Sequence, residues 1–376
     1  MTQTQQNACA GRIERLRALM AERGYDAVIL RNNPDLLWLT DARGVFDDEV
    51  AHTAMVTPTE LLLHTDSRYY NSFVERMGDD SPWKLDKEVV SAPEWAAAHI
   101  AAARARVVAI EDTCTLAFYD ELTYQCSKAS VAPALPRMHG DICNLRMVKD
   151  EEELELLREA QRITDEAFEH ICGYIKVGMT EQQIRNELER CMMSLGAEGI
   201  SFETIIAAGP NGANPHARPG TRAVEEGDLI VMDYGALYEG YHADMTRTVC
   251  LGQPSEEQMA VYEVVRRAHE ECAAAIAPDV IGRDIHNLSV KIIGDAGYGE
   301  YYGHGLGHGV GLEIHENPGF GRYWDKPVPE GSVVTVEPGI YLPGKFGIRL
   351  EDCGVVTKDG YQPFTRASHD LRVIEV

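Results

Sequence analysis

Short apolar runs alternate with helical spacings in the first third of the chain. Residues 26–30, 36–39 and 107–110 are dominated by apolar side chains over a few positions, which predicts buried strands. Between residues 13 and 20, apolar side chains recur every three or four positions, which indicates a helix. Prolines and a glycine interrupt the pattern between residues 131 and 141. We therefore expect a small α/β domain over residues 1–138 and a second domain over residues 139–376.

Three helix starts in the second domain carry the signature of a capping box, in which a short polar residue is followed three positions later by an acid or an amide. These pairs are Asp150 with Glu153, Thr180 with Gln183, and Ser255 with Gln258. Apolar residues at helical spacing follow each pair. The sequence therefore predicts three well-defined helices, beginning near residues 150, 180 and 255.

The second domain also contains an internal repeat. An offset of 104 positions places residues 227–236 over residues 331–340, and the same offset places residues 178–184 over residues 282–288. A helix start and a strand thus recur together, so we infer two related halves, each of two helices followed by antiparallel strands, around a pseudo-two-fold axis. The offset also places the acid Asp233 of the first half over the acid Glu337 of the second.

Charged residues interrupt several predicted strands of this domain. Asp233 stands in a long apolar run, and a buried carboxylate is costly unless a cation or hydrogen-bond donors accompany it. The two-residue period of a strand puts Asp244 and Thr246 on one face, and it does the same for Arg349 and Glu351 in a later strand. We expect these polar faces to converge on one place.

A glycine-rich segment over residues 302–315 adds histidines to this set. Glycine occupies positions 303, 305, 307, 309 and 311. This density disfavours a helix, so His304 and His308 do not form a helical zinc motif, although they are four positions apart. The strict alternation of glycines also differs from a dinucleotide-binding fingerprint. We expect an extended or bulged strand with close approach of its backbone to a neighbour.

Four acids and one histidine of these segments form a candidate metal-binding set: Asp233, Asp244, His308, Glu337 and Glu351. Such oxygen-rich donors suit hard or borderline divalent ions such as Mn²⁺ or Co²⁺. Four carboxylates suggest two ions rather than one. Two ions about 3.5–4 Å apart can hold a hydroxide between them and stabilise a tetrahedral intermediate.

Composition excludes several other classes of protein. The 376 residues include 35 basic and 60 acidic side chains, a net charge of −25 that would repel nucleic acid and anionic membranes. No apolar run approaches the length of a membrane span, and the first ten residues lack the features of a signal peptide, so we expect a cytoplasmic protein. The nine cysteines are scattered without a C-x-x-C pair, which predicts mostly reduced, buried thiols.

Six motifs occur in order along the second domain: Asn214-Pro-His216, Met232-Asp-Tyr-Gly235, Asp244-Met-Thr-Arg-Thr248, His304-Gly-Leu-Gly-His308, Val336-Glu-Pro-Gly339 and Arg349-Leu-Glu-Asp352. With these motifs the chain resembles, over essentially its whole length, the metallopeptidases of the creatinase, prolidase and aminopeptidase P group. The resemblance implies an α+β protein. Its C-terminal domain would have the pita-bread fold, an antiparallel sheet with flanking helices and pseudo-two-fold symmetry, and a small α/β creatinase-type domain would precede it.

The resemblance also implies that each of the five donors is a metal ligand. Asp233 would bind one of two divalent ions, His308 and Glu337 would bind the other, and Asp244 and Glu351 would contact both. Mn²⁺ or Co²⁺ would be the ions, with Zn²⁺ as an alternative. All five donors are intact, which separates the chain from the creatinases, the branch that uses no metal.

Further roles follow from the same resemblance. His216 and His315 would steady the substrate carbonyl and its oxyanion, and His304 would line the pocket near the scissile bond, although an ordinary histidine beside the site is an alternative for it. Glu337 would move protons between the bridging water and the departing amine. Arg349 would orient an acidic ligand.

The other histidines have no such assignment. His242 shares its strand with Asp244 and is interpreted as a bystander. Eight more belong to no motif and are interpreted as ordinary surface or core residues: His52, His64, His99, His139, His170, His269, His286 and His369.

We therefore expect a metal-dependent hydrolase of Xaa-Pro peptide bonds with a small proline-containing peptide as substrate. An Xaa-Pro dipeptidase, or prolidase, is favoured because Arg218, Arg322 and Lys326 lie near the metal motifs and could hold a terminal carboxylate. Aminopeptidase P is the main alternative. A hydrolase of a small non-peptide amide and a non-catalytic interaction protein of the same fold are two others. The resemblance further implies a homodimer, in which the loop over residues 41–49 would reach toward the partner's pocket.

Overall fold

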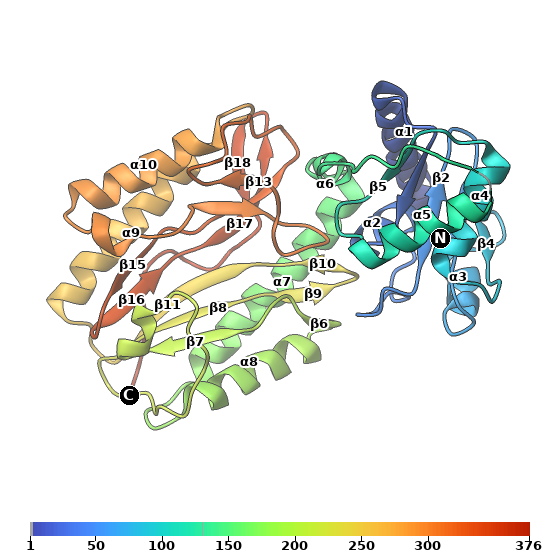
Figure 1. Cartoon of the computed structure of the whole chain (residues 1–376). Coiled ribbons are helices and arrows are strands. Elements are labelled where there is room, and N and C mark those ends of the chain that lie inside the picture. The colour runs from blue at the N-terminus through green and yellow to red at the C-terminus, as the bar shows by residue number, and fades with distance from the viewer. Residues whose placement is uncertain (1–2, 130) are drawn as a thin grey trace. The chain divides into compact units, whose positions relative to one another are not determined.

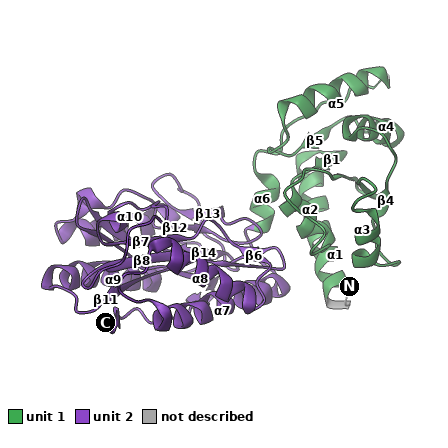
Figure 2. Cartoon of the chain, turned by 90° about the horizontal axis from the view of Figure 1, so that it is seen from below, with its two compact units in different colours: residues 1–146 green, residues 147–376 purple. Residues whose placement is uncertain are grey.

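The structure is a computed structural model that describes residues 3–129 and 131–376. It separates into two compact units, Met1–Arg146 and Met147–Val376, which Figure 2 shows in different colours. The short helix α6 (Asp141–Arg146) belongs to the first unit. The division between residues 138 and 139 that the sequence favours stays a prediction about the limits of the folding domains.

The first unit is a mixed five-stranded sheet with helices around it. Its strands follow the order β4-β3-β2-β1-β5, in which β1 pairs in parallel with β5 and antiparallel with β2. The elements are α1 (Gln3–Arg23), β1 (Ala27–Leu30), α2 (Asn33–Thr40), β2 (Thr53–Val56), β3 (Leu61–His64), α3 (Tyr70–Met77), β4 (Lys84–Asp86), α4 (Ala92–Ala103), β5 (Val108–Ile110) and α5 (Leu116–Lys128). The α/β character predicted for this part of the chain is confirmed.

One predicted strand of this unit is wrong. Residues 36–39 lie in helix α2, where Leu36, Trp38 and Leu39 are fully buried. A helix that is buried all round shows a continuous apolar run, and over four residues such a run cannot be told from a strand. Pro34 in the first turn of this helix was the local signal for a helix start.

The second unit repeats one sequence of elements. Its first half comprises α7 (Glu151–Tyr174), α8 (Glu181–Ser194), β6 (Gly199–Ile200), β7 (Ile205–Ala208), the 3₁₀-helix η1 (Gly209–Ala213), β8 (Leu229–Tyr234), β9 (Ala236–Tyr238), β10 (Tyr241–His242) and β11 (Met245–Leu251). Its second half comprises α9 (Glu256–Ala275), α10 (Gly282–Asp295), η2 (Gly299–Tyr301), β12 (Gly307–Gly309), β13 (Glu316–Phe320), β14 (Val333–Val336), β15 (Gly339–Leu342), β16 (Phe346–Arg349), β17 (Asp352–Thr357), β18 (Gly360–Pro363) and β19 (Arg372–Ile374).

Equivalent strands of the two halves pair in equivalent ways. In the first half β8 runs antiparallel to β11, with Asp233 opposite Thr246. In the second half β14 runs antiparallel to β17, with Val336 opposite Asp352. The paired helices α7 and α8 cover the sheet that contains β8, and α9 and α10 cover the sheet that contains β14, as Figure 1 shows. The predicted α+β class and the two-half architecture are confirmed.

Local sequence signals account for the helix starts of this unit. The predicted capping boxes form at α7, α8 and α9, where each N-cap side chain accepts the backbone N–H three residues on and the side chain there accepts the N-cap N–H. Among the helices that the structure describes, none combines the length and the apolar character that crossing a membrane requires.

A buried ion pair connects the start of α7 to the second half. Lys149 Nζ lies 3.0 Å from Glu316 Oε2 on β13, and each side chain is only 1% exposed. Because both charges are out of water, each stabilises the other, and Glu316 Oε1 also accepts the Glu313 backbone N–H at 3.0 Å.

We expect Lys149→Met to destabilise this unit by about 3–5 kcal/mol, because it leaves the Glu316 carboxylate buried without its cation. Lys291→Met is the matched control: its ion pair with Asp295 is mostly exposed, so its loss should change stability far less. Urea denaturation followed by circular dichroism measures both. Equal stabilities for the two variants would contradict a dominant role for the buried pair.

Candidate metal centre

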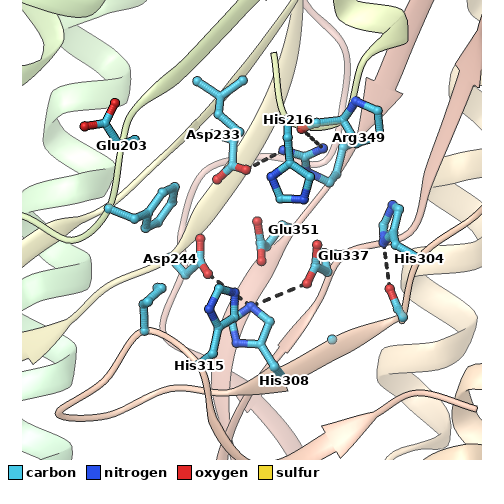
Figure 3. Close-up of a pocket in the computed structure, with 16 residues that line it drawn as sticks. Glu203, His216, Asp233, Asp244, His304, His308, His315, Glu337, Arg349 and Glu351 are labelled. Carbon is cyan, nitrogen blue, oxygen red and sulfur yellow. Dashed lines mark hydrogen bonds and ion pairs between the residues drawn. The ribbon is translucent and has the colours of Figure 1, made fainter. Parts of the chain in front are cut away.

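A cavity of about 480 Å³ lies in the second unit, and the nine residues proposed from the sequence as metal ligands or catalytic groups all line it (Figure 3). The lining comprises Phe202, Glu203, Ile205, Pro215, His216, Asp233, Asp244, His304, Gly305, Gly307, His308, Ile314, His315, Glu337, Arg349 and Glu351. Both halves of the unit contribute, because Asp233 and Asp244 come from the first half and His308, Glu337 and Glu351 come from the second.

The acids sit at strand ends, where the backbone leaves the sheet. Asp233 is the penultimate residue of β8, and Glu337 directly follows β14. Asp244 directly precedes β11 rather than lying within one long strand, and Glu351 lies between β16 and β17. The polar faces that the strand period predicted thus converge, although two of their members occupy short connections.

Close backbone packing places His308. Strand β12 is short, and its pairing with β13 shifts register between His308 and Gly309, as expected of a bulged strand. A Cβ atom at Gly307 would lie 2.0 Å from the Thr335 carbonyl oxygen, so only glycine allows β12 to approach this closely. The His308 backbone N–H then donates to Thr335 Oγ1 at 3.1 Å.

The imidazole of His308 lies between two carboxylates. Its Nε2 is 3.5 Å from Asp244 Oδ2 and 3.5 Å from Glu337 Oε1. Its Nδ1 lies 3.1 Å from the Gly309 carbonyl oxygen, which only accepts, so Nδ1 carries the proton. The lone pair on Nε2 therefore faces the acids. Ligand atoms of Asp244, His308 and Glu351 all lie within 4.8 Å of one another.

Arg349 holds Asp233 in place. Its Nη2 donates to Asp233 Oδ2, its Nη1 donates to the Tyr341 hydroxyl at 2.8 Å, and its Nε donates to Thr246 Oγ1 at 3.1 Å. The second oxygen of Asp233, Oδ1, is buried and has no hydrogen-bond partner among the described residues. Thr246 Oγ1 in turn donates to Glu351 Oε2 at 2.7 Å. One oxygen of Asp233 and one oxygen of Glu351 are thereby held by hydrogen bonds from the protein.

Burial and mutual repulsion disfavour the ionised form of these acids. Burial, with the charge of Asp233, raises the pKa of Glu337 to about 8 against the opposing effect of Arg349. Burial raises the pKa of Asp244 and of Glu351 well above the usual range, and neighbouring carboxylates add to both shifts. Burial also lowers the pKa of His308 to about 4, which keeps its ring neutral.

These properties fit divalent cations. Carboxylates that repel one another, a neutral imidazole directed at them and a buried, unpartnered oxygen on Asp233 are together stabilised by positive charge in their midst. The oxygen-rich donor set is the type that hard or borderline divalent ions prefer.

Three further histidines surround the acids. The ring of His315 lies edge-on to that of His308, with centroids 4.4 Å apart. His304 Nε2 is 2.9 Å from the Tyr341 hydroxyl, and burial lowers the pKa of His304 to about 4. His216 lines the cavity on the side of Arg349 (Figure 3). His242 lies outside this lining, where its Nδ1 is 2.9 Å from Ser201 Oγ.

Sequence reasoning missed several residues that line the cavity or support its walls. Tyr341 bridges His304 and Arg349 through its hydroxyl, but a single tyrosine in the apolar strand β15 gave no signal. Apolar residues and the exposed Glu203 complete the wall without belonging to any motif. Only the tertiary fold brings them to the acids.

An adjoining cavity contains one of the three cations proposed to hold a carboxylate. Arg322 lines it together with His304, Gly305 and Gly307, which also line the first cavity. Arg218 and Lys326 line neither of these two cavities. The side chain of Lys326 lies over the ring of Trp324 instead, 5.5 Å from its centroid.

Comparisons with known proteins identify the family of the chain. The model of metallopeptidase family M24 matches residues 155–358, and the model of the creatinase/prolidase N-terminal domain matches residues 12–148. The Xaa-Pro dipeptidase of Pyrococcus horikoshii is 31% identical over 96% of this chain and 98% of its own length.

Two solved structures are similar over almost the whole chain. The Xaa-Pro dipeptidase from Bacillus anthracis has a TM-score of 0.90 and 32% identity, and the match covers 97% of this chain and 99% of that one. The X-Pro aminopeptidase from Thermotoga maritima has a TM-score of 0.84 and 33% identity, and the match covers 93% of this chain and 98% of that one. The chain therefore belongs to metallopeptidase family M24 and is a metal-dependent hydrolase with a creatinase/prolidase-type N-terminal domain.

Proposed function

We propose that this protein is an Xaa-Pro dipeptidase that uses two divalent metal ions. The observation that carries the proposal is the position of the His308 ring, whose Nε2 lone pair faces the carboxylates of Asp244 and Glu337 in a cavity that Asp233 and Glu351 also line. Relatives named Xaa-Pro dipeptidase, among them the Pyrococcus horikoshii and Bacillus anthracis proteins, support the choice of substrate.

Five residues would hold the ions. Asp233 would bind one ion, His308 and Glu337 the other, and Asp244 and Glu351 would contact both. We assign Mn²⁺ or Co²⁺ to the site, because four carboxylates favour harder ions, with Zn²⁺ as the alternative. When bound, such ions supply Lewis acidity and an activated water for hydrolysis at neutral pH.

Side chains of the cavity would also stabilise the reacting bond, transfer a proton and orient a metal ligand. His216 and His315 would donate hydrogen bonds to the carbonyl oxygen of the scissile bond as negative charge develops on it. Glu337 would carry a proton to the departing proline nitrogen. Arg349 would hold Asp233 in the orientation that its Nη2 contact fixes.

The wall of the cavity suits proline. Phe202, Ile205 and Ile314 present apolar surface to the space beside the acids, where a pyrrolidine ring would find contacts. Proline has no amide N–H, so a site for it needs shape rather than a backbone acceptor. His304, next to both cavities, would lie between this ring and Arg322.

Aminopeptidase P is the second candidate function. It is favoured by the likeness to the Thermotoga maritima X-Pro aminopeptidase, which is as similar in sequence as the dipeptidase from Bacillus anthracis. The two functions differ in what lies beyond proline: a dipeptidase binds a free carboxylate there, whereas an aminopeptidase admits a longer chain. If the protein cleaves neither an Xaa-Pro dipeptide nor a longer peptide with proline in the second position, hydrolysis of a non-peptide amide remains as the function.

We also propose a cytoplasmic homodimer. None of the nine cysteines, all of which are described, forms a disulfide, and seven of them are buried, which suits a reducing compartment. Light scattering of the purified chain tests the dimer, which would have twice the 41.7 kDa mass of one chain.

The substrate is tested with a matched pair of peptides, an Xaa-Pro dipeptide and the same peptide extended by one residue after proline. Chelator-stripped protein resupplied with Mn²⁺, Co²⁺ or Zn²⁺ should cleave the dipeptide and leave the longer peptide largely intact, and it should have no activity before metal is returned. Efficient cleavage of the longer peptide would instead establish an aminopeptidase.

Arg322→Ala should raise KM for the dipeptide about tenfold or more, because a charge-assisted hydrogen bond to the terminal carboxylate contributes about 1.5–3 kcal/mol. Lys326→Ala is the matched control, since Lys326 lines neither cavity and its removal should leave KM unchanged. Steady-state kinetics with both peptides measures the effect. An equal rise in KM for dipeptide and extended peptide would rule out carboxylate binding by Arg322.

The stability of the metal-free protein should fall as pH rises from about 6.5 to 8. The pKa of Glu337 is raised from 4.5 to about 8, so in this range the folded carboxyl binds more protons than the unfolded one, and folding is disfavoured as they are lost. Histidines with lowered pKa values change the stability mainly below pH 6.5, outside this window. Urea midpoints in chelator measure the slope, which Glu337→Gln should reduce. A stability that is constant or rises over the window would contradict the raised pKa.

A further inference from the structure

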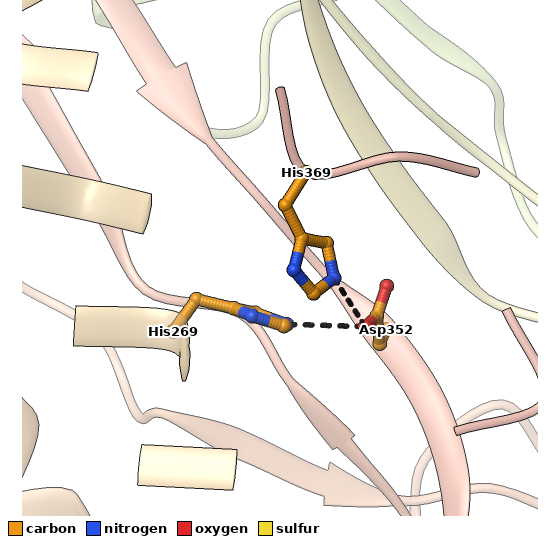
Figure 4. Close-up of side chains that lie close together, drawn as sticks. All are labelled: His269, Asp352 and His369. Atoms are coloured by element: carbon orange, nitrogen blue, oxygen red, sulfur yellow. Dashed lines mark hydrogen bonds and ion pairs between the residues drawn. The ribbon is translucent and has the colours of Figure 1, made fainter. Parts of the chain in front are cut away.

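A second group of side chains that could bind a metal lies outside the 480 Å³ cavity that contains the proposed catalytic residues, here called the catalytic cavity (Figure 4). It consists of His269 on α9, Asp352 at the start of β17, and His369 in the segment between β18 and β19. One ligand atom from each lies within 4.8 Å of the other two. Asp352 follows Glu351 directly but does not line the catalytic cavity, because successive side chains of an extended chain point to opposite sides.

His269 is buried without a hydrogen bond. Its side chain is 1% exposed, and neither ring nitrogen has a hydrogen-bond partner among the described residues. Its Nε2 faces Asp352 Oδ2 at 3.6 Å, which is too long for a hydrogen bond. Leaving a buried polar group unpaired costs about 1–3 kcal/mol. A cation between the imidazole nitrogen and the carboxylate oxygen would satisfy both.

The spacing of the three groups suits a small divalent cation. His369 Nε2 is 2.8 Å from Asp352 Oδ2, and its ring lies above that of His269 in Figure 4, with the two ring centroids 4.5 Å apart. Zinc bonds of about 2.0–2.2 Å to nitrogen and oxygen separate neighbouring donors in a tetrahedral site by roughly 3.3–3.6 Å. The 3.6 Å between His269 and Asp352 matches this range, and the 2.8 Å between His369 and Asp352 is shorter, so a small outward shift of the His369 side chain would complete the site.

Neighbouring groups hold these ligands in place. Arg247 Nη2 donates to the other oxygen of Asp352 at 2.7 Å, and Glu270 Oε1 lies 3.6 Å from His369 Nδ1. Tyr262 donates its hydroxyl to the His369 carbonyl oxygen at 3.0 Å. A second layer of this kind commonly orients metal-bound carboxylates and imidazoles.

Charge and access are also compatible with a cation. Asp352 and Glu270 contribute two negative charges near the site, whereas Arg247 contributes one positive charge. His369 is 30% exposed, so one ligand of the group is in contact with solvent. Two neutral imidazoles and one carboxylate are ligands that Zn²⁺ accepts, with a fourth position left for water.

We propose that His269, Asp352 and His369 bind a divalent cation of the Zn²⁺ class, separate from the ions of the catalytic cavity. The ion would fasten the segment around His369 to helix α9 and strand β17. Arg247, which contacts Asp352, also donates to the Glu351 carbonyl oxygen at 2.6 Å, so the site would brace the backbone of a proposed catalytic ligand from behind.

Zinc stoichiometry tests the site in the full chain. Chelator-stripped protein is titrated with Zn²⁺ against a chromophoric zinc chelator, and His369→Asn and His269→Gln are expected to bind one equivalent fewer than the wild type. His170→Gln is the matched control, because His170 and Glu187 form a histidine–carboxylate pair at 2.6 Å near the surface that belongs to no group of three possible ligands among the described residues, and this variant should lose nothing. His369 is partly exposed, so its variant keeps the test valid if the His269 variant fails to fold.

Location is read from crystals of the zinc-loaded wild type. An anomalous difference peak at the zinc edge is expected between His269 Nε2, Asp352 Oδ2 and His369 Nε2, and it should be missing in His369→Asn. Equal stoichiometry in wild type and His369→Asn would overturn the proposal and leave a simple ion pair between His369 and Asp352. Equal losses in the His369 and His170 variants would indicate adventitious surface binding and would overturn it as well.

Discussion

The repulsion among buried carboxylates is the constraint on which the second unit depends. Asp233, Asp244, Glu337 and Glu351 share one cavity with the neutral ring of His308, and burial together with their mutual charge raises the pKa of three of them. Such a cluster is stable only when other parts of the protein fix it and positive charge compensates it. The fold can be understood as the framework that holds this cluster in place.

Two halves of one repeat supply that framework. Thr246 of the first half donates to Glu351 of the second, and Arg349 of the second half reaches back to Asp233 and Thr246 of the first. Tyr341 links Arg349 to His304. Because these hydrogen bonds cross between the halves, a shift of one sheet against the other would misplace acids from both. The pseudo-symmetric arrangement thus builds one site from strand ends of both halves.

Residues on the side of the sheet opposite the cavity also help to hold the site in place. Glu351 faces the cavity and Asp352 faces the opposite side, where Arg247, His269 and His369 surround it. Arg247 also holds the backbone oxygens of Thr246 and Glu351, at 2.9 and 2.6 Å. The adjacent residues Glu351 and Asp352 therefore belong to two polar clusters, one on each side of the sheet. The contacts of Arg247 in the cluster around Asp352 hold the backbone of the cluster around Glu351.

The sequence by itself determined the features that depend on local spacing. Capping boxes located α7, α8 and α9, alternating glycines indicated the bulged strand around His308, and the six motifs indicated the family and the residues that meet in the cavity. Local spacing was insufficient for residues 36–39, where a fully buried helix and a buried strand have the same apolar pattern. Only the tertiary structure decided that Tyr341 joins Arg349 to His304, that Arg322 rather than Lys326 lines the adjoining cavity, and that His269 and His369 meet at Asp352. These contacts join residues that are distant in sequence or that carry no motif, and their partners are set by the packing of helices on sheets rather than by any period along the chain.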